Sequence, residues 1–382
     1  MTYCKRAFDH IFSDANGHYK LCCVASINPD LRKYTTNNTK PFEFFMSDEM
    51  EAIRNDMIEG KEIKGCEGCY ANEKAGFESH RAMWQDDKVT EVLPHSLEVK
   101  LRIFGSACNL SCYMCHPGNS TTRNKELRQI DSDIFTTHSA DYFKMDNEVI
   151  EANVEDVLDH IDLVGSILII GGEPFLMTKH WEFLDKIPKE RRKNIKLLYQ
   201  TNLTKTKHRR WNVRDYLAEF KDSELQVSCD HFGERLKWIR YPIDVPEFEA
   251  NLVEFKQHIS WLNLTVSILN VHDLCSIVEY YDRNFGLRVE PSAVVTLPKA
   301  LSIKNLPDDM KETAYAEIER LKRNTWVHEF VEAELNKPRD EQQYEKFRDY
   351  IKKLDAKRGT NANEVFGWDI YDGQESPTGK PE

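Results

Sequence analysis

The sequence predicts an α/β fold, in which short strands alternate with helices, followed by further helices toward the C-terminus. Six runs of aliphatic and β-branched residues are typical of strands, and several lead into glycine or polar residues, as parallel strands do at their carboxyl ends. These runs cover residues 97–104, 166–170, 196–199, 225–228, 264–271 and 289–297. The chain has 382 residues, which is enough for a large core and one or two accessory modules.

The most informative motif follows the first of these strands. Cys108, Cys112 and Cys115 have the spacing Cys-x3-Cys-x2-Cys. Three thiolates this close on one loop can hold one metal centre, and three is one fewer than the four that usually hold a [4Fe-4S] cluster. One iron would then be open to a substrate or cofactor. A zinc site is the alternative, because His116 follows at once as a fourth ligand.

A second motif, Gly171-Gly172-Glu173-Pro174, follows the second strand. Glycines let the backbone approach a ligand closely, although an ordinary strand-to-helix turn has the same composition. The cysteine triplet and this segment together resemble the radical S-adenosylmethionine (SAM) superfamily. The resemblance implies a partial (β/α)6 barrel, in which the open iron chelates the amino and carboxylate groups of SAM and the Gly-Gly-Glu-Pro segment holds the amino group.

Further polar residues follow the later strands. The resemblance implies that Asn202, Ser228 and Arg240 contact the ribose and carboxylate of SAM, although each is equally typical of a cap or turn. The planar fork of Arg240 suits a carboxylate. Candidate catalytic residues come next to Ser228: Cys229 as a hydrogen-atom donor, with Asp230 and His231 as proton acceptors. The alternative for Cys229 is an inert buried thiol.

The N-terminal region carries a second cysteine set, formed by Cys4, Cys22, Cys66 and Cys69. It resembles the twitch domain, the shortened form of the SPASM domain, which commonly follows the barrel but here precedes it. The resemblance implies that these four cysteines hold an auxiliary [4Fe-4S] cluster. Cys23 is adjacent to Cys22, and the Gly-x4-Cys spacing favours Cys22 as the ligand. A structural zinc ribbon is the alternative for this set.

Composition places limits on partners and location. The net charge of -12 argues against nucleic-acid binding. The ten cysteines suggest no disulfide framework, and we find neither a secretory signal nor an apolar run long enough to span a bilayer. We therefore expect a cytoplasmic protein that does not associate with a membrane.

The predicted domains are a twitch-like auxiliary cluster domain over residues 1–92 and a radical SAM core barrel over 93–300. A C-terminal helical extension over 301–372 and a disordered tail over 373–382 follow. Residues 117–143 are polar and weakly periodic, and are expected to form an insertion or lid that faces the substrate. Helices are predicted from caps and 3.6-residue periodicity over residues 47–59, 151–161, 308–322, 326–335 and 341–354.

The resemblance implies an enzyme that reductively cleaves SAM to a 5'-deoxyadenosyl radical, which abstracts hydrogen from a peptide or small-molecule substrate. The cofactors would be two [4Fe-4S] clusters and SAM, with the auxiliary cluster as electron acceptor. An external one-electron reductant of the flavodoxin or ferredoxin type is the expected partner. The alternative is a non-catalytic zinc-binding adaptor with two cysteine sites, which would have no need for the Gly-Gly-Glu-Pro segment.

Overall fold

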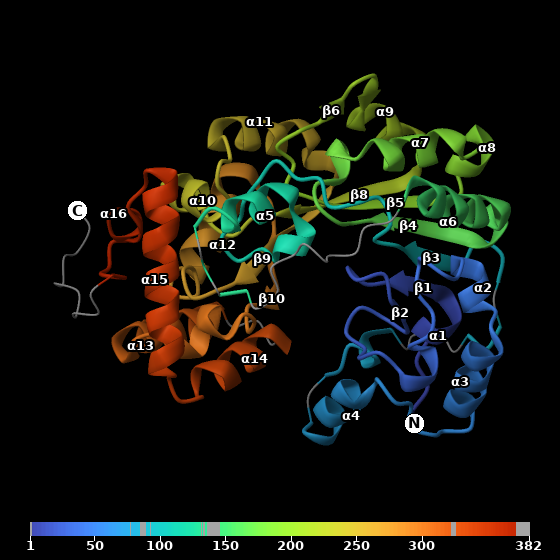
Figure 1. Ribbon diagram of the computed structural model, residues 1–382, viewed down its shortest axis with the longest axis horizontal. Helices are drawn as coiled ribbons and strands as arrows, with labels where there is room; N and C mark the ends of the chain where they lie inside the picture. The colour runs from blue at the N-terminus through green and yellow to red at the C-terminus, as the bar shows by residue number, and fades with distance from the viewer. Residues whose placement is uncertain are drawn as a thin grey trace. The chain divides into compact units, whose positions relative to one another are not determined.

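The computed structural model describes residues 2–76, 78–84, 89–91, 93–130, 132, 134–135, 146–321 and 326–371. The chain divides into two compact units, which are described separately. Unit 1 comprises Met1–Ala107, Asp141–Thr201 and Lys205–Gln226. Unit 2 comprises Cys108–Ala140, Asn202–Thr204 and Val227–Glu382. Figure 1 labels the helices and strands of both units.

Unit 1 is built on a mostly parallel sheet with the strand order β2-β1-β3-β4-β5-β8. Its strands are β1 (His10–Ser13), β2 (Tyr19–Lys20), β3 (Leu97–Lys100), β4 (Val164–Ile169), β5 (Lys196–Thr201) and β8 (Lys221–Ser228), the last of which ends in unit 2. β1 and β2 pair in antiparallel fashion. The pairs β1 with β3, β3 with β4, and β4 with β5 are parallel. Ile167, Ile169, Leu197 and Tyr199 are buried in its core.

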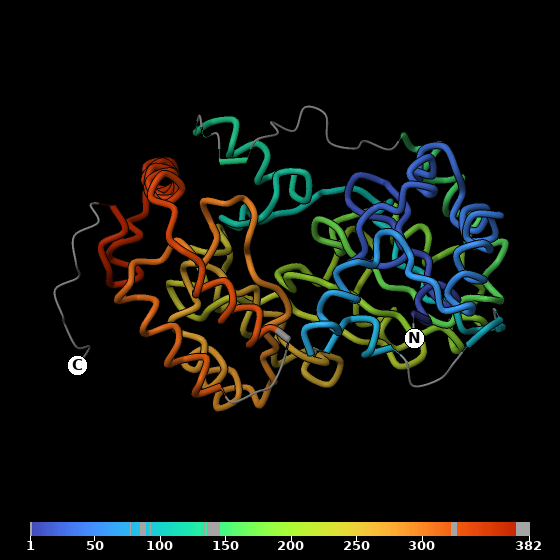
Figure 2. Tube along the Cα trace, turned by 90° about the horizontal axis from the view of Figure 1, so that it is seen from below, coloured from blue at the N-terminus to red at the C-terminus, as the bar shows by residue number. Residues whose placement is uncertain are grey.

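The N-terminal cysteine-bearing segment shares this sheet with the predicted barrel strands. β1 pairs with β3, and His10 lies opposite Glu98. Figures 1 and 2 both show this segment, in blue, alongside the green elements of the same unit. A local sequence pattern does not predict such a pairing, because residues 10 and 98 are distant in the chain. In its described residues the unit also contains eight α-helices: α1 (Arg6–Asp9), α2 (Pro41–Phe45), α3 (Asp48–Ile58), α4 (Glu67–Lys74), α6 (Asn147–Asp159), α7 (Thr178–Lys186), α8 (Lys189–Arg192) and α9 (Val213–Glu219). A small hairpin is formed by β6 (Lys207–His208) and β7 (Trp211–Asn212).

Unit 2 contains the parallel pair β9 (Ile259–Val266) and β10 (Val289–Val294). Alternate residues Leu262, Leu264 and Val266 of β9 are fully buried, as one face of a strand requires. The helices are α5 (Thr121–Leu127), α10 (Gly233–Ile239), α11 (Val245–Phe255), α12 (Leu274–Phe285), α13 (Asp308–Leu321), α14 (Trp326–Leu335), α15 (Glu341–Arg358) and α16 (Ala362–Phe366). The long α15 is the red helix of Figure 1.

The six predicted strands all form, but several end earlier than expected. The run 264–271 stops as a strand at Val266, because the backbone N–H of Ser267 donates to Asn270 Oδ1 at 2.7 Å and closes a turn. The run 289–297 ends at Val294, shortly before Pro298, which has no N–H to donate to a sheet.

The polar region after the cysteine triplet contains regular structure in its described part, and its role as a substrate-facing insertion or lid stays a prediction. Its described part forms a helical turn at Pro117–Asn119 and α5, which Ser120 caps by accepting from the N–H of Arg123 at 3.1 Å. Residues 131, 133 and 136–143 of the predicted insertion lie outside the described residues, as does the predicted tail over 373–382. None of the described helices has the length and apolar character needed to cross a membrane.

Candidate functional site

The three cysteines of the Cys-x3-Cys-x2-Cys motif lie on an irregular loop of unit 2 that precedes α5. All three are half-buried. The loop turns tightly, since the N–H of Cys115 donates to the carbonyl of Cys112 at 3.0 Å and the N–H of Leu110 donates to Cys108 Sγ at 3.4 Å. The thiol of Cys115 donates to the carbonyl of His116 at 3.6 Å. The sulfur atoms are thus presented by a loop that is already ordered by its own hydrogen bonds.

The backbone of this loop is bonded to the segment at the end of α10. The N–H of Ser111 donates to the carbonyl of Tyr241 at 2.6 Å, and the N–H of Tyr113 donates to the carbonyl of Ile239 at 3.0 Å. These two bonds fix the middle of the loop from one side. The residue between Ile239 and Tyr241 is Arg240, which the same contact brings to the cysteines.

Asn202 and Arg240, two of the predicted SAM contacts, lie beside the cysteine sulfurs in unit 2. Asn202 Nδ2 is 3.8 Å from Cys108 Sγ, and an Arg240 guanidinium nitrogen donates to Cys112 Sγ at 4.0 Å. Another nitrogen of Arg240 forms a buried ion pair with Asp230 at 2.7 Å. Burial raises the pKa of the Cys112 thiol, and the positive charge of Arg240 opposes that rise. The third predicted contact, Ser228, is half-buried at the end of β8.

The Gly-Gly-Glu-Pro turn follows β4 in unit 1 and lies against residues 105–107, which lead into the cysteine loop. The N–H of Glu173 donates to the carbonyl of Ala107 at 2.7 Å. The carboxylate of Glu173 is fully buried and accepts from the Thr201 hydroxyl at 2.7 Å and from the N–H of Phe175 at 3.2 Å. Pro174 begins the short helical turn Pro174–Leu176. A Cβ on Gly171 would lie 3.1 Å from the backbone oxygen of Gly105, so the turn needs glycine where the two backbone segments meet.

The candidate catalytic residues Cys229, Asp230 and His231 are fully buried in unit 2. The thiol of Cys229 donates to the carbonyl of His231 at 3.2 Å, and burial raises its pKa to about 12. Asp230 accepts from the N–H of Thr265 at 2.9 Å in addition to pairing with Arg240. Burial lowers the pKa of His231, whose Nδ1 accepts from the N–H of Phe232 at 2.9 Å. Each side chain is thus already engaged in the packing of the unit.

The four N-terminal cysteines line one pocket in unit 1. The pocket encloses about 430 Å³, counted out to its open mouth, and Cys4, Cys22, Cys66 and Cys69 all contribute to its wall. Burial, together with the nearby thiols, raises the pKa of Cys4 and of Cys66 to about 12. The described lining includes Cys22 but not Cys23, which is exposed. The choice of Cys22 over Cys23 as a ligand stays a prediction.

Several backbone contacts hold this pocket together. The N–H of Ser26 donates to the carbonyl of Gly65 at 2.8 Å, and a Cβ on Gly65 would lie 2.7 Å from the carbonyl oxygen of Ser26. Gly65 also has a φ of +93°, which favours glycine. Arg81 donates to the carbonyl of Tyr3 at 2.7 Å and pairs with Glu73. The first contact joins the segment after Cys22 to the segment before Cys66, and Arg81 holds the segment before Cys4.

In the part of the chain that the structure describes, no group of three or more His, Cys, Asp or Glu side chains converges closely enough to hold one metal ion. The N-terminal cysteines instead surround a pocket. Four cysteine thiols are the usual donor set of a closed [4Fe-4S] cluster and also of a structural zinc ion, whereas three thiols would leave one iron of such a cluster open.

Residues 103–280 match the family model of the radical SAM superfamily. This stretch of the chain is therefore similar to the radical SAM superfamily, and that superfamily implies a [4Fe-4S] cluster and SAM. The matched residues include the cysteine triplet, the Gly-Gly-Glu-Pro turn, Asn202, Ser228 and Arg240. The four N-terminal cysteines lie outside the match.

Solved structures with a similar chain trace include anSMEcpe with bound AdoMet and the Cp18Cys peptide, at 18% identity and a TM-score of 0.39, covering 62% of this chain and 61% of that chain. TYW1 with a lysine-pyruvate adduct bound is similar at 14% identity and a TM-score of 0.29, covering 57% of this chain and 70% of that chain. This chain thus spans about 61% of the length of anSMEcpe. No curated protein matches it.

Proposed function

We propose that this protein is a radical SAM enzyme whose SAM-binding [4Fe-4S] cluster is held by Cys108, Cys112 and Cys115. When bound, the cluster and SAM supply a 5'-deoxyadenosyl radical, which abstracts hydrogen from a peptide or small-molecule substrate. The observation that carries the proposal is the cysteine loop itself, because it lies inside the radical SAM match and has polar side chains beside its sulfurs.

Asn202 and Arg240 have a defined part in this proposal. Their N–H groups face the sulfurs of Cys108 and Cys112, and such donors stabilise negative charge on thiolate ligands. Within the described part of the chain, Arg240 Nε is a buried donor without a hydrogen-bond partner. A buried donor is costly to leave unsatisfied, so a polar acceptor from a ligand, such as the SAM carboxylate, fits there.

We propose that Cys4, Cys22, Cys66 and Cys69 hold the auxiliary [4Fe-4S] cluster. Support comes from the shared pocket that these four residues line. Four cysteine ligands leave no iron open to substrate, so the role proposed for this cluster is electron transfer. The electron for SAM cleavage would come from an external flavodoxin or ferredoxin type of reductant. The proposed substrate is either a peptide or a small molecule.

The proposal is tested by incubating anaerobically purified, reconstituted protein with SAM and dithionite and measuring 5'-deoxyadenosine and methionine. We expect both products from the wild type and from a Cys66→Ala/Cys69→Ala variant, because the SAM-binding loop is intact in each. A Cys108→Ala/Cys112→Ala/Cys115→Ala variant should form neither. Production of 5'-deoxyadenosine by that triple variant would show that the cluster is assigned to the wrong cysteines.

A further inference from the structure

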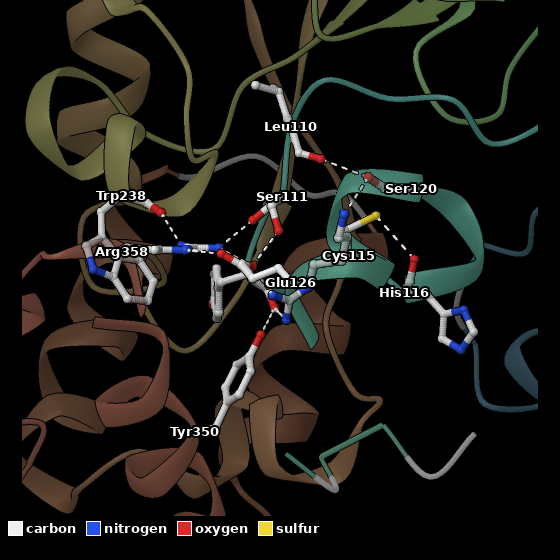
Figure 3. Close-up of polar contacts among 11 residues, drawn as sticks. Leu110, Ser111, Cys115, His116, Ser120, Glu126, Trp238, Tyr350 and Arg358 are labelled. Atoms are coloured by element: carbon white, nitrogen blue, oxygen red, sulfur yellow. Dashed lines mark hydrogen bonds and ion pairs between the residues drawn. The ribbon is translucent and has the colours of Figure 1, made fainter. Parts of the chain in front are cut away.

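The helix α15 near the C-terminus contacts the backbone of the cysteine loop within unit 2. Tyr350 donates its hydroxyl to the carbonyl of Tyr113 at 2.5 Å, and Arg358 donates to the carbonyl of Ser111 at 2.6 Å. Tyr113 and Ser111 flank Cys112 on either side. Figure 3 shows Tyr350 and Arg358 approaching the loop from the helix. The middle cysteine is therefore held by residues more than 200 positions later in the chain.

A buried charge network reinforces these contacts. Glu126 of α5 accepts from Arg123 at 2.6 Å and from two nitrogens of Arg358 at 2.7 and 2.9 Å. It also accepts from the hydroxyl of Ser111. Arg358 completes its bonding by donating to the carbonyl of Trp238 at 3.1 Å. All three guanidinium nitrogens of Arg358 therefore donate hydrogen bonds. The ammonium group of a lysine is a single point charge and cannot reproduce this planar arrangement.

The same region carries net positive charge beside the loop. Arg240 donates to Cys112 Sγ at 4.0 Å, while Arg358 and Arg123 donate to the carbonyls of the two residues that flank Cys112, at 2.6 and 2.8 Å. The neighbouring carboxylates are Glu126 and Asp230, so three cations face two anions. Iron-sulfur potentials depend on nearby charge, and a cation beside the site favours the reduced, more negative state.

We propose that Tyr350 and Arg358 are positioning residues for the SAM-binding cluster: they fix the loop around Cys112, and Arg358 also raises the reduction potential of the cluster. This inference rests on the proposed function, since it assumes that the loop holds the cluster. It makes α15 part of the cluster site, beyond the residues that match the radical SAM family.

The first test uses the purified protein without its cluster and measures amide hydrogen exchange over residues 108–120. Tyr350→Phe removes one hydrogen bond to the loop and should raise exchange there about fivefold. Tyr344→Phe is the matched control, because Tyr344 is buried on the same helix and its hydroxyl has no hydrogen-bond partner in the described part of the chain. Equal exchange in the two variants would overturn the positioning role.

The second test measures the midpoint potential of the SAM-binding cluster by titration followed by electron paramagnetic resonance. Arg358→Met should shift the potential to a more negative value, and Arg358→Lys should keep it closer to that of the wild type while loosening the loop. Arg348→Met is the control, since Arg348 lies on the same helix but donates to the carbonyl of Tyr371. A potential that changes equally in Arg348→Met and Arg358→Met, or in neither, would overturn the electrostatic role.

These outcomes are separable from failure of the proposed function. Iron, sulfide and SAM cleavage by the wild type decide whether the loop holds a radical SAM cluster. Hydrogen exchange in the cluster-free protein decides whether α15 positions the loop, whatever metal it binds. Where Arg358→Met does not fold, which near-ultraviolet circular dichroism detects, the comparison of Tyr350→Phe with Tyr344→Phe still decides the positioning role.

Discussion

A Cβ atom on Gly172 would lie 2.2 Å from the backbone oxygen of Ala107, the residue immediately before Cys108. The same carbonyl accepts the N–H of Glu173 at 2.7 Å. Both segments belong to unit 1. Residue 172 must therefore be glycine for the turn to pack against the backbone that leads into the cysteine loop. This packing does not depend on a bound ligand.

Gly172→Ala should destabilise the protein, because the added methyl group meets backbone atoms that cannot move aside without cost. Overpacking of this kind typically costs about 1 to 3 kcal/mol. The free energy of unfolding in urea measures the effect. Gly68→Ala is the control, since a Cβ on Gly68 meets nothing within 4 Å and this residue lies in α4. Equal stability of Gly172→Ala and wild type would show that the two segments separate easily.

Glu173→Gln separates a structural role from a SAM-binding role. If Glu173 holds the SAM amino group, replacing the charged hydrogen bond with a neutral one should weaken SAM binding by about 1.5 to 3 kcal/mol. Thr201→Val is the comparison, because it removes only the hydroxyl that donates to Glu173. Calorimetry of SAM binding to reconstituted protein measures both. Unchanged SAM affinity in Glu173→Gln, with a stability loss in both variants, would limit Glu173 to packing.

Single substitutions of the adjacent cysteines test the auxiliary ligand set. Cys22→Ala should lower iron and sulfide by one cluster, because Cys22 lines the pocket with the other three cysteines. Cys23→Ala should retain both clusters, since Cys23 is exposed and lies outside the described lining. Iron and sulfide analysis of the two variants, purified side by side, measures this. The reverse pattern would identify Cys23 as the ligand.

The buried His180 predicts a loss of stability in acid. Burial lowers its pKa to about 3, and its ring contacts the Met177 carbonyl and the Tyr199 hydroxyl. An unfolded histidine has a pKa near 6.5, so below that pH the unfolded chain binds a proton that the folded protein does not. Stability therefore falls as pH falls, by about 1.4 kcal/mol between pH 7.5 and 5.5 from this group.

His180→Gln isolates this contribution from those of the other histidines. The variant should lose about 1.4 kcal/mol less than wild type over the same pH interval, whatever its stability at pH 7.5. Urea unfolding at the two pH values measures the difference. An identical pH dependence in variant and wild type would mean that His180 is protonated in the folded protein.

The strands could be predicted, and the cysteine motifs recognised, because both depend on residues that are close together in the sequence. The Cys-x3-Cys-x2-Cys spacing and the Gly-Gly-Glu-Pro turn are local patterns, and residues 103–280 match the radical SAM superfamily. The predicted positions of the strand ends were less accurate, because a single side-chain contact can end a strand. The contact of Asn270 with the N–H of Ser267 ends β9 in this way. The ligand and SAM-contact roles of individual residues stay predictions.

Contacts between distant parts of the chain were not predictable in this way. The pairing of β1 with β3 and the bonds from Tyr350 and Arg358 to the cysteine loop have no local signal. The charged residues of α15 are typical of a solvent-exposed helix, yet Arg358 is buried. Burial of Cys229 likewise depends on the packing of the whole unit.

The central claim is that the two cysteine sets hold two iron-sulfur clusters, one of which serves SAM cleavage. Metal and acid-labile sulfide analysis of protein purified without oxygen tests this claim most directly. The account predicts about eight iron and eight sulfide per chain, as two [4Fe-4S] clusters require. Stoichiometric zinc without sulfide would contradict it and favour a zinc-binding adaptor.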